Sequence, residues 1–263
     1  MIAAPPAFEP PPQTSEALFS ALLLMRPERL AHLLASDPDR AAPRVRAAAE
    51  RGLVEAQVRY GRLLLEGRGV TRDACAALGW FRRAAAHGDA DACNMVGRCL
   101  ENGWGAVASP GEATPWYRRA ADAGLAWAQY NLAHLLLDGN GLKRDAAAAL
   151  EWYRRAAAQG HVRAMNLVGR CLEHGWGCAC DPAQARVWYA RSAAGGYFRG
   201  QFNHADCLAA DGDLEAAVDM FTASLASAPA ANRRFMAEAL LARDEPRLRD
   251  LGRRALSGGA SCS

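Results

Sequence analysis

The sequence predicts an all-α fold, an α/α superhelical solenoid of 36-residue helix-turn-helix repeats. Three observations predict it. Two stretches, NMVGRCLENGWG at 94–105 and NLVGRCLEHGWG at 166–177, are nearly identical and lie 72 residues apart. Tryptophans recur every 36 residues, and so does a Gly-x-Gly motif; the tryptophans are Trp80, Trp116, Trp152 and Trp188, and the motifs begin at Gly67, Gly103, Gly139 and Gly175. Self-similarity at a fixed period of this size is typical of solenoids.

Each repeat is predicted to form two helices. The first helix of the first repeat is expected over Val54–Glu66, because Ala56, Gly61 and Leu64 share one helical face. The Gly-x-Gly motif ends this helix, since glycine adopts positive φ at little cost. The second helix is expected to begin after a side chain that caps the first turn; these residues are Asp73, Ser109, Asp145 and Asp181.

Small residues and tryptophans are both assigned to packing. Gly61 and its counterparts let the first helix approach its partner closely, and the tryptophan of the second helix is expected in the core between hairpins. A single hairpin cannot bury both of its faces, so neighbouring hairpins have to stack.

The period also divides the chain. The degenerate fifth repeat lacks part of the loop and has Met220 and Phe221 where the other repeats have Trp and an aromatic residue. Atypical ends are expected because a solenoid has to cover its terminal faces. The predicted segments are a disordered Pro-rich lead (1–14), N-terminal capping helices with a partial repeat (15–52), four repeats (53–88, 89–124, 125–160 and 161–196), the degenerate repeat (197–229), C-terminal capping helices (230–256) and a tail (257–263).

Composition favours a cytoplasmic protein whose partner is neither nucleic acid nor membrane. The chain has 31 basic and 28 acidic residues, a balance that gives no strong field for anionic partners. The apolar stretch at 17–25 is too short to span a bilayer. The start, MIAAPPAFEPPPQT, lacks the basic region of a secretory signal, so we expect the cysteines to be mostly reduced thiols.

The stretch EAQVRYGRLLLEGRGVTRDACAALGWFRRAAAHGD resembles the Sel1-like repeat, a bacterial relative of the tetratricopeptide repeat with a longer Gly-x-Gly loop. The resemblance covers about 53–229. It implies an α/α superhelix whose members are adaptors and scaffolds for protein complexes, mostly without enzymatic activity. Some members are secreted and carry a cysteine pair in each repeat. Cys93 matches the first cysteine of that pair, but Ala85 stands at the partner position, which counts against that branch.

We expect function where the repeats differ. Positions 58, 62 and 65 and their counterparts share one face of the first helix by i, i+4, i+7 spacing. In solenoids of the resembled type the first helix lines the inner surface, so these side chains are expected to face one concave groove. The predicted partner-binding residues are Asn94, Arg98, Glu101, Tyr130, His134, Asn166, Arg170 and Glu173.

The residue types suit a protein or peptide partner. Guanidinium groups bind carboxylates, an asparagine amide can pair with an extended backbone, and Tyr130 could be an aromatic anchor. In the alternative interpretation, Arg98 and Glu101 pair with each other and only solvate the surface. Trp104 and Trp176, in the loops of the two polar repeats, either extend the binding surface or pack over their own hairpins.

A cysteine–histidine cluster offers a second function. The stretch CLEHGWGCAC holds Cys171, His174, Cys178 and Cys180, and such ligands can bind zinc. However, their spacing matches no standard zinc knuckle, and Cys171 falls in a column of apolar packing residues. We therefore expect no metal or other cofactor, and keep a metal- or redox-responsive regulatory module as the alternative function.

Signatures of catalysis are absent from the sequence. It has no Gly-rich phosphate loop followed by Lys, no H-E-x-x-H and no G-x-S-x-G. An open groove also differs from the enclosed pocket that catalysis favours. The leading hypothesis is a non-enzymatic adaptor or scaffold that binds a peptide or protein surface in its concave groove.

Overall fold

The structure is a computed structural model that describes residues 32, 33 and 35–257. Within these residues it has thirteen helices and no strand, so the predicted all-α solenoid class is confirmed. The predicted lead (1–14), residues 15–31 and 34 of the N-terminal capping segment and most of the tail lie outside the described residues. The chain divides into two compact units, Met1–Ala123 (unit 1) and Gly124–Ser263 (unit 2).

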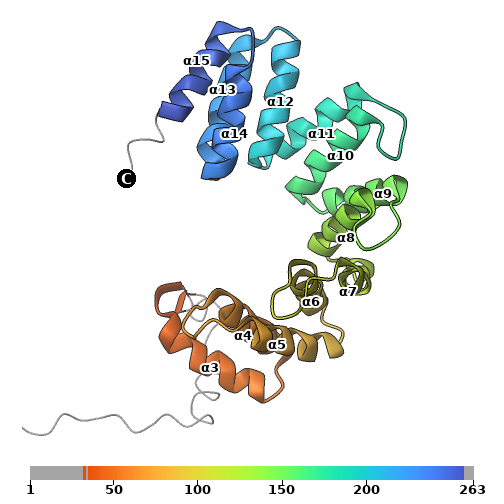
Figure 1. Ribbon diagram of the computed structural model, residues 1–263, viewed down its shortest axis with the longest axis vertical. Coiled ribbons are helices and arrows are strands. Elements are labelled where there is room, and N and C mark those ends of the chain that lie inside the picture. Colours follow the sequence, from red (N-terminus) through yellow and green to blue (C-terminus); the bar gives the residue numbers. More distant parts are fainter. Residues whose placement is uncertain (1–31, 34, 258–263) are drawn as a thin grey trace, which may run out of the picture. The chain divides into compact units, whose positions relative to one another are not determined.

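Unit 1 is a succession of antiparallel helices, each packed on the next one along the chain (Figure 1). The tightest pairs are the two hairpins α4–α5 and α6–α7, and α3 packs on α4. The helices are α3 (Pro38–Glu50), α4 (Val54–Glu66), α5 (Ala74–Ala86), α6 (Ala90–Asn102) and α7 (Pro110–Asp122).

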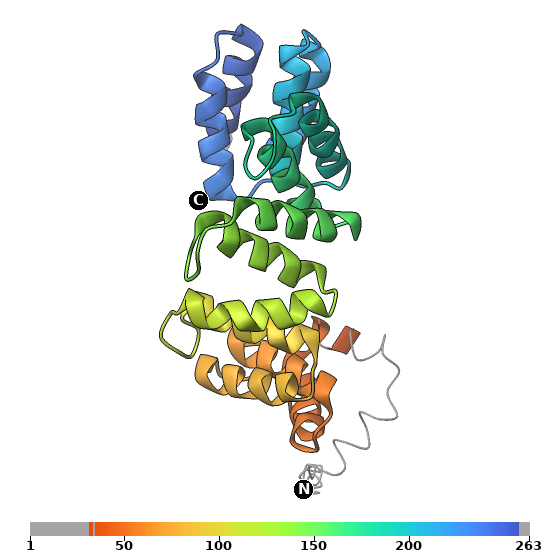
Figure 2. The same cartoon turned by 90° about the vertical axis from the view of Figure 1, so that its right-hand side faces the viewer.

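Unit 2 continues the same pattern and ends in a cap. Helix α10 contacts α12 as well as α9 and α11, so successive first helices meet. Figure 2 shows the last helices packed side by side, around a core that includes Phe221, Met236 and Leu240. The helices are α8 (Ala126–Asp138), α9 (Ala146–Ala158), α10 (Val162–His174), α11 (Pro182–Ala194), α12 (Phe198–Ala210), α13 (Leu214–Ser227), α14 (Ala230–Leu241) and α15 (Pro246–Ser257).

The helix boundaries predicted from local signals are confirmed. The side chains of Asp73, Ser109, Asp145 and Asp181 each accept a hydrogen bond from the backbone N–H three residues further on. Gly67 ends α4 with φ 71°, a value that favours glycine. Gly69 has a second role, because a Cβ there would lie only 2.1 Å from the carbonyl oxygen of Pro38. The second glycine therefore lets the loop contact the start of α3.

The packing residue of the second helix differs from the prediction. The four repeat tryptophans are only half-buried, whereas the residue that follows each of them is almost fully enclosed. The indole lies at the border of the core because the helix turns by about 100° from one residue to the next. Arginines cover three of the four indoles, Arg83 over Trp80, Arg155 over Trp152 and Arg191 over Trp188. The enclosed residues are Phe81, Tyr117, Tyr153 and Tyr189.

The glycine of the first helix makes room for these rings, as predicted. A Cβ at Gly97 would lie 2.7 Å from the ring of Tyr117, and one at Gly169 would lie 2.6 Å from the ring of Tyr189. Both distances are far shorter than van der Waals contact, so a larger residue there would push the helices apart.

None of the helices described between residues 35 and 257 combines the length and the apolar character that are needed to cross a bilayer.

Candidate functional site

The two polar rows of the predicted site lie on α6 in unit 1 and on α10 in unit 2. On α10, Asn166, Arg170 and Glu173 follow one another along one face of the helix, at successive turns. The exposure of these side chains increases along the helix: Asn166 is 3% exposed, Arg170 is half-buried and Glu173 is exposed. On α6 the asparagine is again the most enclosed, with Asn94 6% exposed, but there Arg98 is exposed and Glu101 is half-buried.

The asparagines of the two rows are largely enclosed, so little of the Asn94 or Asn166 side chain is open to solvent. The Oδ1 atom of Asn166 accepts a hydrogen bond from Nδ2 of Asn203 on α12, at 2.8 Å. Position 166 lies in the first half of α10, where it faces α12 and also borders a hollow between α10, α12 and α14. Asn166 therefore joins α10 to α12, and Asn94 is likewise enclosed.

The glutamates are held from inside by the buried tyrosines. The Tyr117 hydroxyl donates to Oε2 of Glu101 at 2.6 Å, and the Tyr189 hydroxyl donates to Oε2 of Glu173 at 2.7 Å. Burial, together with the bonded carboxylate, raises the pKa of both tyrosines far above the ordinary value, so each hydroxyl remains a donor. The alternative pairing of Arg98 with Glu101 does not occur among the described ion pairs.

Each arginine instead lies over the loop tryptophan of its own hairpin. The guanidinium of Arg98 is 5.2 Å from the ring centre of Trp104, and that of Arg170 is 5.0 Å from the ring centre of Trp176. Both distances are within the range of cation–π interactions. The two loop tryptophans are half-buried, so they pack on their own hairpins and also fix the position of the arginine.

The third predicted row, on α8, separates into two roles. Tyr130 is half-buried in an aromatic cluster, with ring centres 4.9 Å from His161 and 6.0 Å from Tyr153. His134 is exposed, and its Nδ1 lies 3.3 Å from the carboxylate of Asp138. Tyr130 therefore supports the helix packing, while His134 faces solvent.

Two hollows flank Arg170 in unit 2. The first, between α8 and α10, has a volume of about 420 Å³ and is lined in part by His134, Leu137 and Trp176. The second, between α10, α12 and α14, has a volume of about 450 Å³ and is lined in part by Glu173, Phe202 and Phe235. Arg170 lines both hollows. We call the two hollows with Arg170 between them the Arg170 surface.

Several lining residues of the second hollow were not predicted. Phe202 lies 36 residues after Asn166, at the same place in the repeat, so extending the row into the degenerate fifth repeat would have found it. Phe235 and Met236 belong to α14, outside the periodic part of the chain, and no periodic signal marks them.

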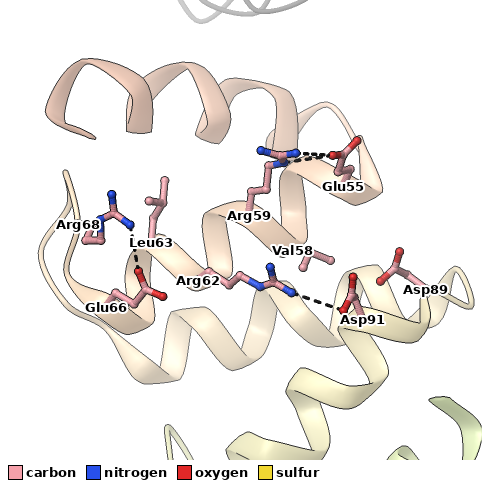
Figure 3. A pocket seen from close by; sticks show the side chains of 9 residues that line it. All are labelled: Glu55, Val58, Arg59, Arg62, Leu63, Glu66, Arg68, Asp89 and Asp91. Atoms are coloured by element: carbon pink, nitrogen blue, oxygen red, sulfur yellow. Dashed lines mark hydrogen bonds and ion pairs between the residues drawn. The ribbon is translucent and has the colours of Figure 1, made fainter. Parts of the chain in front are cut away.

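Unit 1 has a hollow of a different kind, shown in Figure 3. Its volume is about 380 Å³, and charged side chains line most of it. These charges pair with one another: Arg62 reaches Asp91 on α6 at 3.5 Å, and Arg59 reaches Glu55 at 2.7 Å. Mutual neutralisation leaves this hollow with less attraction for a charged partner than an unpaired group would give.

The cysteines of the predicted cluster have different surroundings, although Cys178 Sγ lies 3.7 Å from the backbone oxygen of Cys171. Cys171 is buried, and burial raises the pKa of its thiol to about 11, so the reactive thiolate is disfavoured. Cys180 is exposed, and its Sγ donates to the backbone oxygen of Glu173 at 2.9 Å. Nowhere in the described part of the chain do three or more His, Cys, Asp or Glu side chains form a group that could hold a metal ion.

Helix hairpins of equal length, closed by left-handed glycines and stacked within each unit, define an α-solenoid repeat protein. The chain belongs to the Sel1 repeat family: the model of the Sel1 repeat matches residues 54–89, 90–125, 128–161 and 162–197, more than half of the sequence. This fold is commonly a protein-interaction module, and the family is generally non-catalytic.

Solved structures agree with this assignment. A Sel1 repeat protein from Oxalobacter formigenes is 28% identical, with a TM-score of 0.74 over 86% of this chain and 94% of the other. Protein c5321, a protective antigen present in uropathogenic Escherichia coli strains, is 22% identical, with a TM-score of 0.70 over 93% of this chain. Only 54% of that antigen is covered, so this chain spans about half its length.

More distant likeness shows the fold alone. The immunity protein Pa5087 from Pseudomonas aeruginosa is 16% identical, with a TM-score of 0.51 over 78% of this chain and 80% of the other. A search among curated protein sequences found no match.

Proposed function

We propose that the protein is a non-enzymatic adaptor or scaffold that binds a peptide segment or protein surface on the Arg170 surface of unit 2. The observation that carries this proposal is the position of Arg170 between two hollows, each large enough for side chains of a partner. A guanidinium held over an indole ring by a cation–π contact can still donate its N–H groups to a carboxylate or a carbonyl oxygen. No described ion pair involves Arg170.

Arg98 is the corresponding contact that we propose in unit 1, because Trp104 holds it in the same way. Glu101, Tyr130, Glu173 and His134 would then border the contacts rather than make the central ones. Non-enzymatic action and a cytoplasmic location are parts of the same proposal, and they rest on the sequence arguments given above.

The test is capture of partners from an extract of the native cell by the purified full-length chain. Arg170→Gln removes the charge and the cation–π contact on the first-helix side. Arg155→Gln is the matched control, because Arg155 lies 4.5 Å from the ring centre of Trp152 on the second helix α9. Quantitative mass spectrometry should show at least a tenfold loss of specific partners with Arg170→Gln and none with Arg155→Gln.

Both variants should unfold at the same temperature as the wild type to within about 2 °C, since each replaced side chain lies at least partly in solvent. Equal capture by the two variants would contradict the proposed binding surface.

A further inference from the structure

The hollow between α10, α12 and α14 combines an apolar floor with a positively charged rim, and this combination selects for a particular kind of segment. Phe198 and Phe202 are half-buried on α12, and Met236 is 5% exposed on α14. The centre of the Phe202 ring lies 4.9 Å from the ring centre of the fully buried Phe221, so the floor is continuous with the core of the C-terminal cap. A floor attached to the core is rigid and needs no reorganisation to receive a side chain.

Phe235 is the exposed part of this apolar lining. It is 72% exposed, although phenylalanine gains free energy from burial. A large aromatic side chain that borders a hollow and remains in solvent is typical of a binding surface. Phe235 lies on α14 opposite the arginine of α10, so an occupant of the hollow would contact both.

Two arginines form the rim. Arg170 lies over Trp176, and the guanidinium of Arg199 is 5.7 Å from the ring centre of Phe198. No described ion pair involves either arginine. The one carboxylate in the lining is that of Glu173, which already accepts the Tyr189 hydroxyl and lies 3.5 Å from Nε2 of His174. The rim therefore has an excess of positive charge that a carboxylate of the occupant could neutralise.

Asn166, Asn203 and Asn232 contribute amide groups to the lining, and Asn203 donates one hydrogen bond to Asn166. Amide side chains pair readily with the backbone of an extended peptide. The volume of about 450 Å³ lies within the range of sites that enclose a ligand, and it is too small for a folded domain. One or two side chains of a peptide are therefore the size of occupant that fits.

We propose that this hollow recognises an extended peptide segment in which an apolar side chain lies within three residues of an aspartate or glutamate. The apolar side chain fills the space between Phe202 and Phe235, and the carboxylate binds Arg170 and Arg199. This inference rests on the proposed function and specifies its partner. Charge complementarity excludes basic segments and favours the acidic ones.

The test starts from a display library of random heptapeptides panned against the immobilised full-length chain. We expect the selected sequences to pair Leu, Ile, Phe or Met with a nearby Asp or Glu, and to be depleted of Lys and Arg. The selected peptide, labelled with fluorescein, is then titrated with the protein, and binding is followed by fluorescence anisotropy.

Four variants separate the two parts of the recognition. Arg199→Gln and Phe235→Ser should each weaken binding at least tenfold, a loss of about 1.4 kcal/mol. The matched controls are Arg155→Gln and Val187→Ser, since Val187 is an apolar residue of α11 that is 46% exposed. The controls should bind within twofold of the wild type. Raising the salt concentration should weaken the wild type more than Arg199→Gln.

The possible failures are distinguishable. Selection of basic or neutral peptides, or no selection, overturns the inference, and so does binding that Arg199→Gln and Phe235→Ser leave unchanged. If capture from the cell extract still depends on Arg170, the proposed function stands without this partner class. If capture does not depend on Arg170 and peptide binding does not depend on Arg199 or Phe235, both proposals fail. Self-association that Phe235→Ser abolishes would show that a second copy of the chain occupies the hollow, which also overturns the inference.

Discussion

Three tyrosines occupy equivalent positions in their repeats, and loss of the hydroxyl group is predicted to destabilise the protein at two of them and to stabilise it at the third. Tyr117 and Tyr189 donate hydrogen bonds to glutamates on the facing helix. The Tyr153 hydroxyl is buried and has no partner among the described residues, because Leu137 stands where the other two repeats have glutamate. Replacing each tyrosine with phenylalanine removes only the hydroxyl.

The expected magnitudes follow from the surroundings of each hydroxyl. A hydrogen bond to a charged acceptor contributes about 1.5–3 kcal/mol, and the lower end applies here because the side chain of Glu173 is 46% exposed and regains water. We expect Tyr189→Phe, and likewise Tyr117→Phe, to lower the free energy of unfolding by about 1.5 kcal/mol. A buried hydroxyl without a partner costs about 1–3 kcal/mol, so Tyr153→Phe should raise the free energy of unfolding by about 1 kcal/mol.

Urea unfolding followed by circular dichroism at the helical band measures these changes, with the dependence on urea concentration expected to be equal for all variants. The first repeat offers a natural precedent, because it has Phe81 in the same place, fully buried, and Leu65 where the glutamate would be. Destabilisation of equal size in all three variants would refute the assignment of hydrogen bonds.

Further predictions concern packing, pH and thiol reactivity. Gly97→Ala should destabilise the protein by about 1–3 kcal/mol, because the added Cβ would meet the enclosed ring of Tyr117. Gly79→Ala should stabilise it by about 0.5–1 kcal/mol, because Gly79 lies in a helix with open space around it. Urea unfolding measures both changes. Burial, and secondarily the charge of Arg163, lowers the pKa of His161 to about 4. As the pH falls, the unfolded chain therefore takes up the proton before the folded chain does. The free energy of unfolding should be unaffected above pH 6.5 and should fall by about 1 kcal/mol as the pH approaches 4. The fall should be smaller in His161→Asn, because asparagine retains the helix cap. Limited alkylation followed by mass spectrometry should modify exposed Cys180 early and buried Cys171 only on unfolding.

Each of these predictions has a contradicting result. Equal effects of the two glycine replacements would show that the ring contact is unimportant. An unchanged dependence on pH in His161→Asn would show that another group titrates. Early alkylation of Cys171 would mean that the thiol is accessible, and would revive the redox-responsive alternative.

The helices could be predicted from the sequence because local signals determine them. The 36-residue period, the capping residues such as Asp145 and the helix-ending glycines such as Gly67 act within a few residues of the boundary they set. Each signal is also repeated four times, which separates it from chance.

The site was predicted less well because its exposure depends on neighbouring hairpins. Spacing placed Asn166 and Arg170 on one helical face, but only the contact with Asn203 shows that the asparagine is enclosed. The apolar half of the site includes Phe235 on a capping helix, where the periodic comparison of repeats gives no information.

The central claim is that a partner binds on the first-helix side of unit 2, and photo-crosslinking in the native cell tests it most directly. A photoreactive phenylalanine analogue at Phe235 should form adducts with a partner protein, and Arg170→Gln in the same chain should abolish them. The same analogue at Val187, on the second helix α11, should form none. Adducts at Val187 with none at Phe235 would contradict the account.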